Sequence, residues 1–350
     1  TPLYSSAASD VYKRQTQRAL YKILQGMLGL MAGPAQAPAL FDALMAHCDT
    51  KTGAINAELY RLARQVQDNA AFFARHDNAT LLANWRSLVT RELPGFVADF
   101  DRLLAEHGHR ETEFDPYVPT WLEAPEVVLS TLRVMAQGAL RNPHENDRQL
   151  KQRMQETLFA LQQQVPQDLR YFFTEVVRLA QTYTSLDDLE HYQTTRLTLP
   201  LRRALRELGG RLHDLGVAAE PMDVFFARLQ TLDSAICNPT AAQWSVLAAE
   251  IGENKLRHER ARNRTPPWNL HEDETFDPAG DEGWQGIPGS PGKVSGSVYL
   301  VHGTDDFGRF PKHAVLVART TNPAWTPLFY GACAVVTESG GPLSHGAVTA

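Results

Sequence analysis

The chain has 350 residues, of which 43% are apolar, so it is long enough for two or three domains with sizeable cores. Its formal net charge of -6 argues against a nucleic-acid-binding surface, and no apolar run reaches the length of a membrane-spanning helix. The three cysteines (Cys48, Cys237 and Cys333) are widely spaced without a Cys-x-x-Cys pair, which argues against a zinc site and favours the reducing cytoplasm.

Both ends of the chain predict an internal fragment of a longer protein. Residues 5–15 read SSAASDVYKRQ and resemble a translated sequencing adaptor, so we expect residues 1–15 to be a non-native scar. At the other end, the sequence stops at Ala350, only about one turn into a helix that the pattern predicts there.

Apolar residues recur at helical spacing almost throughout residues 16–264, which predicts a large all-helical domain. Pro94 and Pro200 are expected to kink or divide two of the helices, and Thr240 with Gln243 predicts a capping box. The expected helices cover residues 16–32, 39–47, 52–66, 80–107, 126–140, 145–164, 167–183, 187–212, a segment from 223, and 240–263.

Residues 107–115, HGHRETEFD, form a polar cluster inside this helical region. Two histidines and three carboxylates in so short a stretch could bind a metal ion. A loop in which the charged side chains pair with one another explains the same residues, and we favour that interpretation and expect no metal.

The pattern changes after the last predicted helix. Residues 265–292 are rich in proline and glycine and keep no periodicity, which predicts an extended linker. Short strands are expected over residues 296–301, 315–318 and 332–337, so residues 293–350 predict a small α/β domain. The fold class expected for the chain is therefore multidomain, a large helical domain followed by a truncated α/β domain.

The last fourteen residues, TESGGPLSHGAVTA, carry the strongest chemical pattern. A buried strand leads into two glycines, a Ser-His pair and small residues that suit the first turn of a helix. Free amides and the positive end of a helix dipole favour an anion at such a place, so His345 could carry a phosphoryl group. The alternative is a core histidine that caps a helix.

With the preceding run TTNPAWTPLF (residues 320–329), this segment resembles the swivelling phosphohistidine domain of the phosphoenolpyruvate-utilising enzymes. That family includes phosphoenolpyruvate synthase, pyruvate phosphate dikinase and rifampicin phosphotransferase. The resemblance implies that His345 is the covalent nucleophile. It also implies that His345 is positioned by Gly340, Gly341 and Ser344, with Thr321 and Thr337 hydrogen-bonding the phosphate or the ring.

The same resemblance implies the cofactors and partners. An ATP-grasp domain, expected elsewhere on the full-length chain, would bind ATP and Mg²⁺ and phosphorylate the histidine. The phosphoryl group would then pass to a small-molecule acceptor, with AMP and phosphate as the other products. We expect this fragment to bind neither cofactor and to be inactive alone.

Two further segments bear on the acceptor. The Gly-His-Arg segment at residue 108 resembles the central region of rifampicin-type members, which implies an acceptor-side role for Arg110, Glu113 and Asp115. Leu343 and Ser344 resemble the rifampicin-type branch, which favours a small-molecule hydroxyl as acceptor. However, this chain has Asp187, Asp188 and Glu190 where such members carry basic residues, so an antibiotic, pyruvate and other acceptors stay open.

The alternative function is a helical ligand-binding or scaffold module with a vestigial histidine domain. An exposed His345 at a helix start would favour the enzyme, and a packed His345 would favour the module.

Overall fold

A computed structural model of the chain contains two compact units. The first comprises Thr1–Glu113, Pro119–Arg196 and Gly289–Ala350, and the second comprises Phe114–Val118 and Leu197–Pro288. For residues 2–14, 304–305 and 326–327 the description covers the backbone alone. The structure describes residues 2–111, 115–137, 142–262, 286, 289, 292–321, 325–329, 331–339 and 346.

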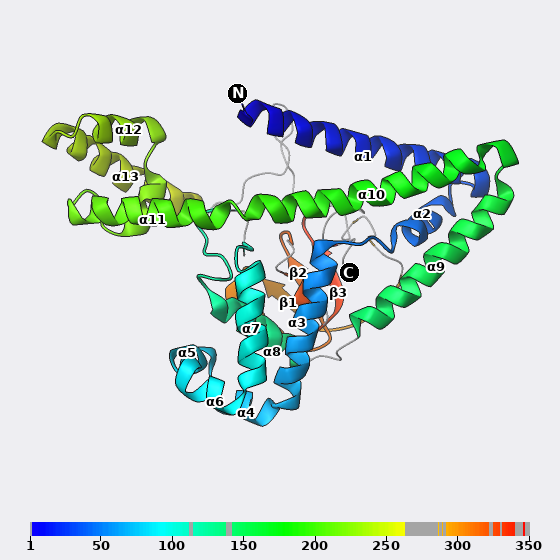
Figure 1. Ribbon diagram of the computed structural model, residues 1–350, viewed down its shortest axis with the longest axis horizontal. Coiled ribbons are helices and arrows are strands. Elements are labelled where there is room, and N and C mark those ends of the chain that lie inside the picture. The colour runs from blue at the N-terminus through cyan, green and yellow to red at the C-terminus, as the bar shows by residue number, and fades with distance from the viewer. Residues whose placement is uncertain are drawn as a thin grey trace, which may run out of the picture. The chain divides into compact units, whose positions relative to one another are not determined.

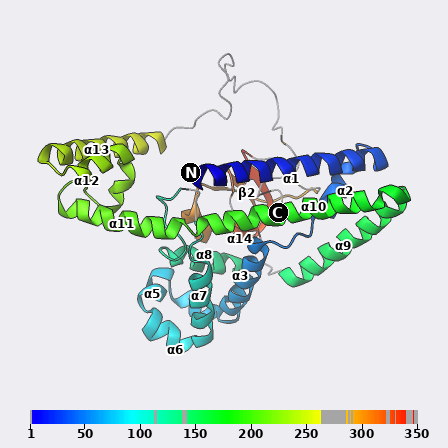
Figure 2. The ribbon, with the colours of Figure 1, turned by 45° about the horizontal axis from the view of Figure 1, so that its top comes forward.

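One group of helices in the first unit packs around a shared apolar core. Figures 1 and 2 show α1 and α10 lying side by side, with α9 meeting the start of α10 and diverging from it at an angle. The core between them contains Leu24, Leu44, Leu161 and Phe173, all at most 2% exposed. The bounds are α1 Pro2–Ala32, α2 Ala37–Met45, α9 Pro143–Gln164, the 3-10 turn η2 Gln167–Leu169 and α10 Arg170–Thr195.

The continuity of α10 contradicts the predicted break between residues 183 and 187. The hydroxyl of Thr184 donates to the carbonyl of Ala180 and also contacts the Tyr21 hydroxyl, so this polar position is satisfied within the helix. Asp187 and Asp188 are consequently interior residues of α10 and not the first turn of a new helix. The real break comes after Thr195.

A second group of helices in the first unit builds the core that lies beneath the polar cluster. It contains Leu59, Phe100, Leu129 and Leu132, all nearly inaccessible. Pro94 begins α7, so this proline divides the predicted long helix. The bounds are α3 Lys51–Asp68, α4 Ala70–Arg75, α5 Asn78–Ala83, the π-helix η1 Trp85–Val89, α6 Thr90–Glu92, α7 Pro94–His107 and α8 Pro125–Gln137.

The end of the first unit is a parallel sheet in the order β1-β2-β3, which confirms the predicted α/β domain. Parallel strands require crossovers, and η4 and α14 lie in the two connections. Phe307 and Leu328 from these connections join Leu316 of β2 and Val134 of α8 in one buried cluster. The bounds are β1 Val298–Val301, η4 Thr304–Arg309, β2 Ala314–Ala318, α14 Thr326–Phe329 and β3 Ala332–Thr337.

The second unit is a small helical body. Gly209 lies so close to the carbonyl oxygen of Pro221 that no side chain fits between α11 and η3. Arg202 is 2% exposed and donates to the carbonyl oxygens of Pro116 and Tyr117, which fastens the loop 115–118 to α11. The bounds are α11 Thr198–Asp214, the 3-10 helix η3 Pro221–Phe226, α12 Leu229–Cys237 and α13 Ala241–Arg262.

Sequence signals for the ends of these helices are partly confirmed. The Thr240 hydroxyl accepts a hydrogen bond from the Gln243 backbone at 3.2 Å, as the predicted cap requires. Pro200 is the third residue of α11, where a missing N–H costs nothing.

Two predictions about organisation remain open. The predicted linker, residues 265–292, lies mostly outside the described ranges, so the division of the chain into scar, helical domain, linker and α/β domain is still a prediction. The origin of residues 1–15 also remains a prediction.

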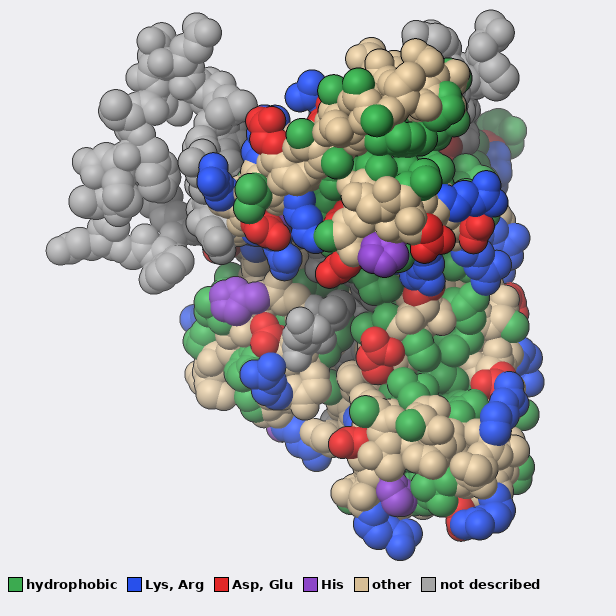
Figure 3. All heavy atoms as spheres, turned by 90° about the vertical axis from the view of Figure 1, so that its left-hand side faces the viewer, with side chains coloured by type: hydrophobic (Ala, Val, Ile, Leu, Met, Phe, Trp, Pro, Cys, Tyr) green, Lys and Arg blue, Asp and Glu red, His purple; other side chains and the backbone are tan. Residues whose placement is uncertain are grey.

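Within the described residues, no helix has both the length and the apolar character that crossing a bilayer demands. On the face in Figure 3, acidic and basic side chains are interspersed.

Candidate functional site

The polar cluster begins where α7 ends. Gly108 donates its N–H to the Leu104 carbonyl, and its backbone passes so close to Leu122 that an added Cβ would lie 2.8 Å from the Leu122 Cβ. Glycine is therefore required by space at this position, and a larger residue would push the following segment away from α7.

A short antiparallel pairing then holds the segment in place. Trp121 donates its N–H to the Arg110 carbonyl at 2.9 Å, and Leu122 donates to the Gly108 carbonyl at 2.9 Å. Glu111 and Thr120 form an antiparallel bridge. This pairing buries His109 and Arg110, which are 8% and 7% exposed.

Tyr192 from α10 lies at the centre of the cluster. Its hydroxyl oxygen is 2.7 Å from Nδ1 of His107, and its ring meets the His109 ring edge to face, with centroids 4.7 Å apart. Lys51 and Arg196 lie over the ring at 5.5 and 5.4 Å from its centroid. Sequence reasoning missed Tyr192, because it is more than 80 residues from the histidines it contacts.

Arg110 is the predicted acceptor-side residue that the structure places in this cluster. Its guanidinium carbon lies 5.3 Å from the centre of the Trp121 ring. Burial lowers the pKa of Arg110 to about 10, against the opposing influence of Asp188, Tyr192 and Glu111, so the side chain is still a cation at neutral pH. A buried cation of this kind suits an anionic or strongly polar ligand.

The neighbouring titratable groups are pushed towards their neutral forms. Burial, followed by the charges of Arg196 and His107, lowers the pKa of His109 to about 4. Burial lowers the pKa of His107 despite the nearby Glu58 and Glu106 carboxylates. Burial also raises the pKa of Glu111. Such groupings of shifted pKa values are common at functional sites.

Of the other two predicted acceptor-side residues, one belongs to the second unit and one lies outside the described residues. Asp115 belongs to the second unit, where its carboxylate accepts a hydrogen bond from the Tyr117 backbone at 2.9 Å, a local turn contact. Glu113 lies outside the described residues.

Two of the residues predicted to surround His345 lie at the carboxyl edge of the parallel sheet. Thr321 follows β2 and Thr337 ends β3, so both lie at the same edge. A Cβ built on Gly346 would be 2.9 Å from Oγ1 of Thr321 and 3.8 Å from Cγ2 of Thr337. Both threonines therefore lie around the residue that follows His345. His345 itself, Gly340, Gly341 and Ser344 lie outside the described residues.

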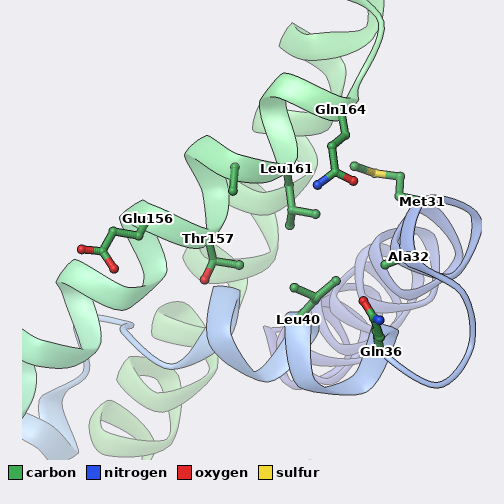
Figure 4. Close-up of a pocket in the computed structure, with 9 residues that line it drawn as sticks. Met31, Ala32, Gln36, Leu40, Glu156, Thr157, Leu161 and Gln164 are labelled. Carbon is green, nitrogen blue, oxygen red and sulfur yellow. The ribbon is translucent and has the colours of Figure 1, made fainter.

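A pocket of about 460 Å³ opens between α1, α2 and α9, far in sequence from the polar cluster. Figure 4 shows Leu40 and Leu161 facing one another across it, with Gln36 and Gln164 at its polar edge. The volume is in the range of small-molecule pockets. None of the residues that line this pocket is a predicted site residue.

Comparison with known proteins gives two family matches. Residues 12–188, half of the chain, match the fourth domain of rifampicin phosphotransferase. Residues 310–350 match the mobile domain of the phosphoenolpyruvate-utilising enzymes.

Three curated relatives are similar to most of this chain. The chain is 27% identical to a chondramide synthase of Chondromyces crocatus over 83% of this chain and 8% of the relative. It is 26% identical to an uncharacterised phosphotransferase, YvkC, of Bacillus subtilis over 73% of this chain and 32% of the relative. It is 27% identical to a rifampicin phosphotransferase of Streptomyces sviceus over 68% of this chain and 28% of the relative. The chain thus spans about a third or less of the length of these relatives.

Proposed function

This chain belongs to the rifampicin phosphotransferase family of the phosphoenolpyruvate-utilising enzymes, and from that premise we propose that it combines the acceptor side and the phosphohistidine carrier of an ATP-dependent phosphotransferase. Membership supports phosphotransferase chemistry in general. The roles of individual residues and the reaction sequence are our proposal.

His345 is the covalent carrier in this proposal. ATP and one water give phosphohistidine, AMP and inorganic phosphate, as a ring nitrogen of His345 takes the β-phosphoryl group. An acceptor hydroxyl oxygen then attacks that phosphorus, the nitrogen–phosphorus bond breaks, and the hydroxyl proton is released. ATP and Mg²⁺ would be held by an ATP-grasp domain of the longer protein and not by residues of this chain.

The observation that carries the proposal is the arrangement of Thr321 and Thr337 around Gly346. Strand ends of a parallel sheet bring both threonine side chains to the backbone beside His345. We propose that the Thr321 hydroxyl, with Thr337, Gly340, Gly341 and Ser344, orients the ring of His345 and donates hydrogen bonds to its phosphoryl group.

Arg110 is the acceptor-side residue with the best structural support. A buried cation held over Trp121 is rigid and partly desolvated, so its interaction with an approaching phosphoryl group is stronger than at the surface. The acceptor that we propose is a small molecule with a hydroxyl group. A cytoplasmic location, expected from the three free cysteines, remains part of the proposal.

The experiment uses the longer protein that contains this chain and an ATP-grasp domain. It is incubated with β-labelled ATP and Mg²⁺ beside His345→Ala and, as a matched control, His302→Ala, an exposed histidine of the same α/β domain. We expect acid-labile, base-stable label in the wild type and in His302→Ala, and none in His345→Ala.

Two outcomes would contradict the proposal. Label that persists in His345→Ala would identify another nucleophile. A folded protein that never acquires label would instead favour the non-catalytic ligand-binding module.

A further inference from the structure

Three potential ligand atoms converge where the end of α7 meets the middle of α3. Nε2 of His107 lies 3.6 Å from Oε1 of Glu58 and 3.7 Å from Oε1 of Glu106. The three atoms all lie within 4.8 Å of one another. We propose that Glu58, Glu106 and His107 bind a divalent transition-metal ion.

One of the two neutral tautomers of His107 presents the lone pair of Nε2 to the carboxylates. In that tautomer the Tyr192 hydroxyl accepts from Nδ1–H of His107 at 2.7 Å and donates to the Glu106 carbonyl at 3.4 Å. A neutral imidazole has one N–H, so Nε2 then carries the lone pair. That arrangement is the one a metal ligand needs, with the second nitrogen held by an outer hydrogen bond.

Nε2 of His107 is buried beside two carboxylates, an environment that a bound cation would stabilise. The His107 side chain is 2% exposed, and Nε2 has no hydrogen-bond partner among the residues that the structure describes. A buried lone pair that faces two carboxylates is unfavourable unless positive charge lies between them.

A proton on Nε2 of His107 would not make good hydrogen bonds to the two carboxylates. At 3.6 and 3.7 Å both carboxylate oxygens are beyond good N–H···O hydrogen-bond length. A tetrahedral ion with bonds of about 2.0–2.2 Å separates its ligand atoms by about 3.4 Å, close to what is seen.

The ligand set indicates the class of ion. One imidazole nitrogen and two carboxylate oxygens suit Zn²⁺, Co²⁺ or Mn²⁺ better than Mg²⁺ or Ca²⁺, which prefer oxygen ligands alone. The Glu58 and Glu106 side chains are 27% and 51% exposed, so solvent can reach the site and water can complete the coordination. The sequence had led us to expect no metal site, so this proposal differs from that expectation. It does not depend on the proposed phosphohistidine chemistry.

The test uses the 350-residue chain, stripped with a chelator and titrated with Co²⁺ and Zn²⁺. We expect one equivalent of Co²⁺, with the visible absorption of an ordered low-symmetry site, and a rise in melting temperature on addition of Zn²⁺. A large excess of Mg²⁺ should not displace the Co²⁺.

Glu58→Gln is the decisive variant because it keeps the size of the side chain and the packing of His107. We expect it to weaken Co²⁺ binding by at least about 10-fold, the lower bound seen when metal-site partners are removed, and to abolish the Zn²⁺-dependent rise in melting temperature. His107→Ala should lose the site, with circular dichroism as the check that it folds. Matched controls are Glu126→Gln and His144→Ala, which alter exposed residues of the same kinds.

Equal Co²⁺ affinity in the wild type and Glu58→Gln would overturn the proposal, as would the absence of stoichiometric binding. Displacement of Co²⁺ by Mg²⁺ would overturn the class of ion.

Discussion

Oδ2 of Asp188 in α10 lies 2.6 Å from the backbone nitrogen of Lys51, the first residue of α3. The same carboxylate accepts from the Thr52 N–H at 3.2 Å and the Thr52 hydroxyl at 2.5 Å. Asp188 therefore caps a helix more than 130 residues away, and its negative charge stabilises the amide end of that helix.

Asp188→Ala should lower the free energy of unfolding by about 1–2 kcal/mol, because it leaves helix N-terminal amides without their acceptor. Asp188→Asn keeps a carbonyl acceptor and should cost less. Urea unfolding measures both, with Asp168→Ala as the control at an exposed carboxylate. Equal stability of Asp188→Ala and the control would show that the cap contributes nothing.

Substitution by alanine should change the stability of the protein in opposite directions at two adjacent glycines of α11. Gly209→Ala places a methyl group against the Pro221 carbonyl and should destabilise the second unit by about 1–3 kcal/mol or more. Gly210 faces open space, so Gly210→Ala should stabilise the helix by up to about 1 kcal/mol. Thermal unfolding shows whether each variant is more or less stable than the wild type. Hydrogen exchange of the α11 amides shows whether the change in stability lies in the second unit. The same sign for both variants would contradict this packing.

The ion pair between Lys255 and Asp223 should make stability depend on pH at the alkaline end. Nζ of Lys255 lies 2.7 Å from Oδ1 of Asp223, whose side chain is 3% exposed, and the hydrogen bond to Asp223 raises the pKa of Lys255. A raised lysine pKa stabilises the folded state fully below the unfolded value of about 10.4, and this stabilisation is lost as the pH rises through the folded value.

Lys255→Met should therefore be less stable than the wild type at pH 8, and the difference should shrink above about pH 10.4, the unfolded lysine pKa. Melting temperatures from pH 8 to pH 11.5 test this, with Lys151→Met as a control at an exposed lysine. A difference that stays constant with pH would rule out a contribution from this ion pair.

Gly346→Ala should reduce phosphohistidine formation in the labelling experiment by about 10-fold or more, because a small displacement beside a reacting group is costly. The added Cβ would lie 2.9 Å from the Thr321 hydroxyl oxygen. Normal labelling of Gly346→Ala would mean that this close approach does not position His345.

Much of the helical architecture could be predicted because it depends on local periodicity. Ile55, Leu59, Leu62 and Val66 recur at helical spacing and all four are buried in α3. The prediction failed between residues 183 and 187, where polar residues suggested a break. A hydrogen bond from Thr184 within the helix and its contact with Tyr21 of α1 keep that segment helical.

The candidate site was only partly predictable. Arg110 stood out as part of a polar cluster, and it is buried as a site residue would be. Glu58 and Tyr192 did not stand out in the sequence, since each looks like an ordinary residue of its own helix. Each contacts His107, from about 50 and 85 residues away in the sequence.

Most of the helices and strands, and the family to which the chain belongs, could be predicted from the sequence, because hydrophobic spacing and short motifs are properties of neighbouring residues. The folded structure was needed to show that Asp188 caps α3, that Tyr192 contacts both histidines and that Gly346 lies against Thr321. Those contacts join distant parts of the chain, and burial of the apolar faces is what brings them together.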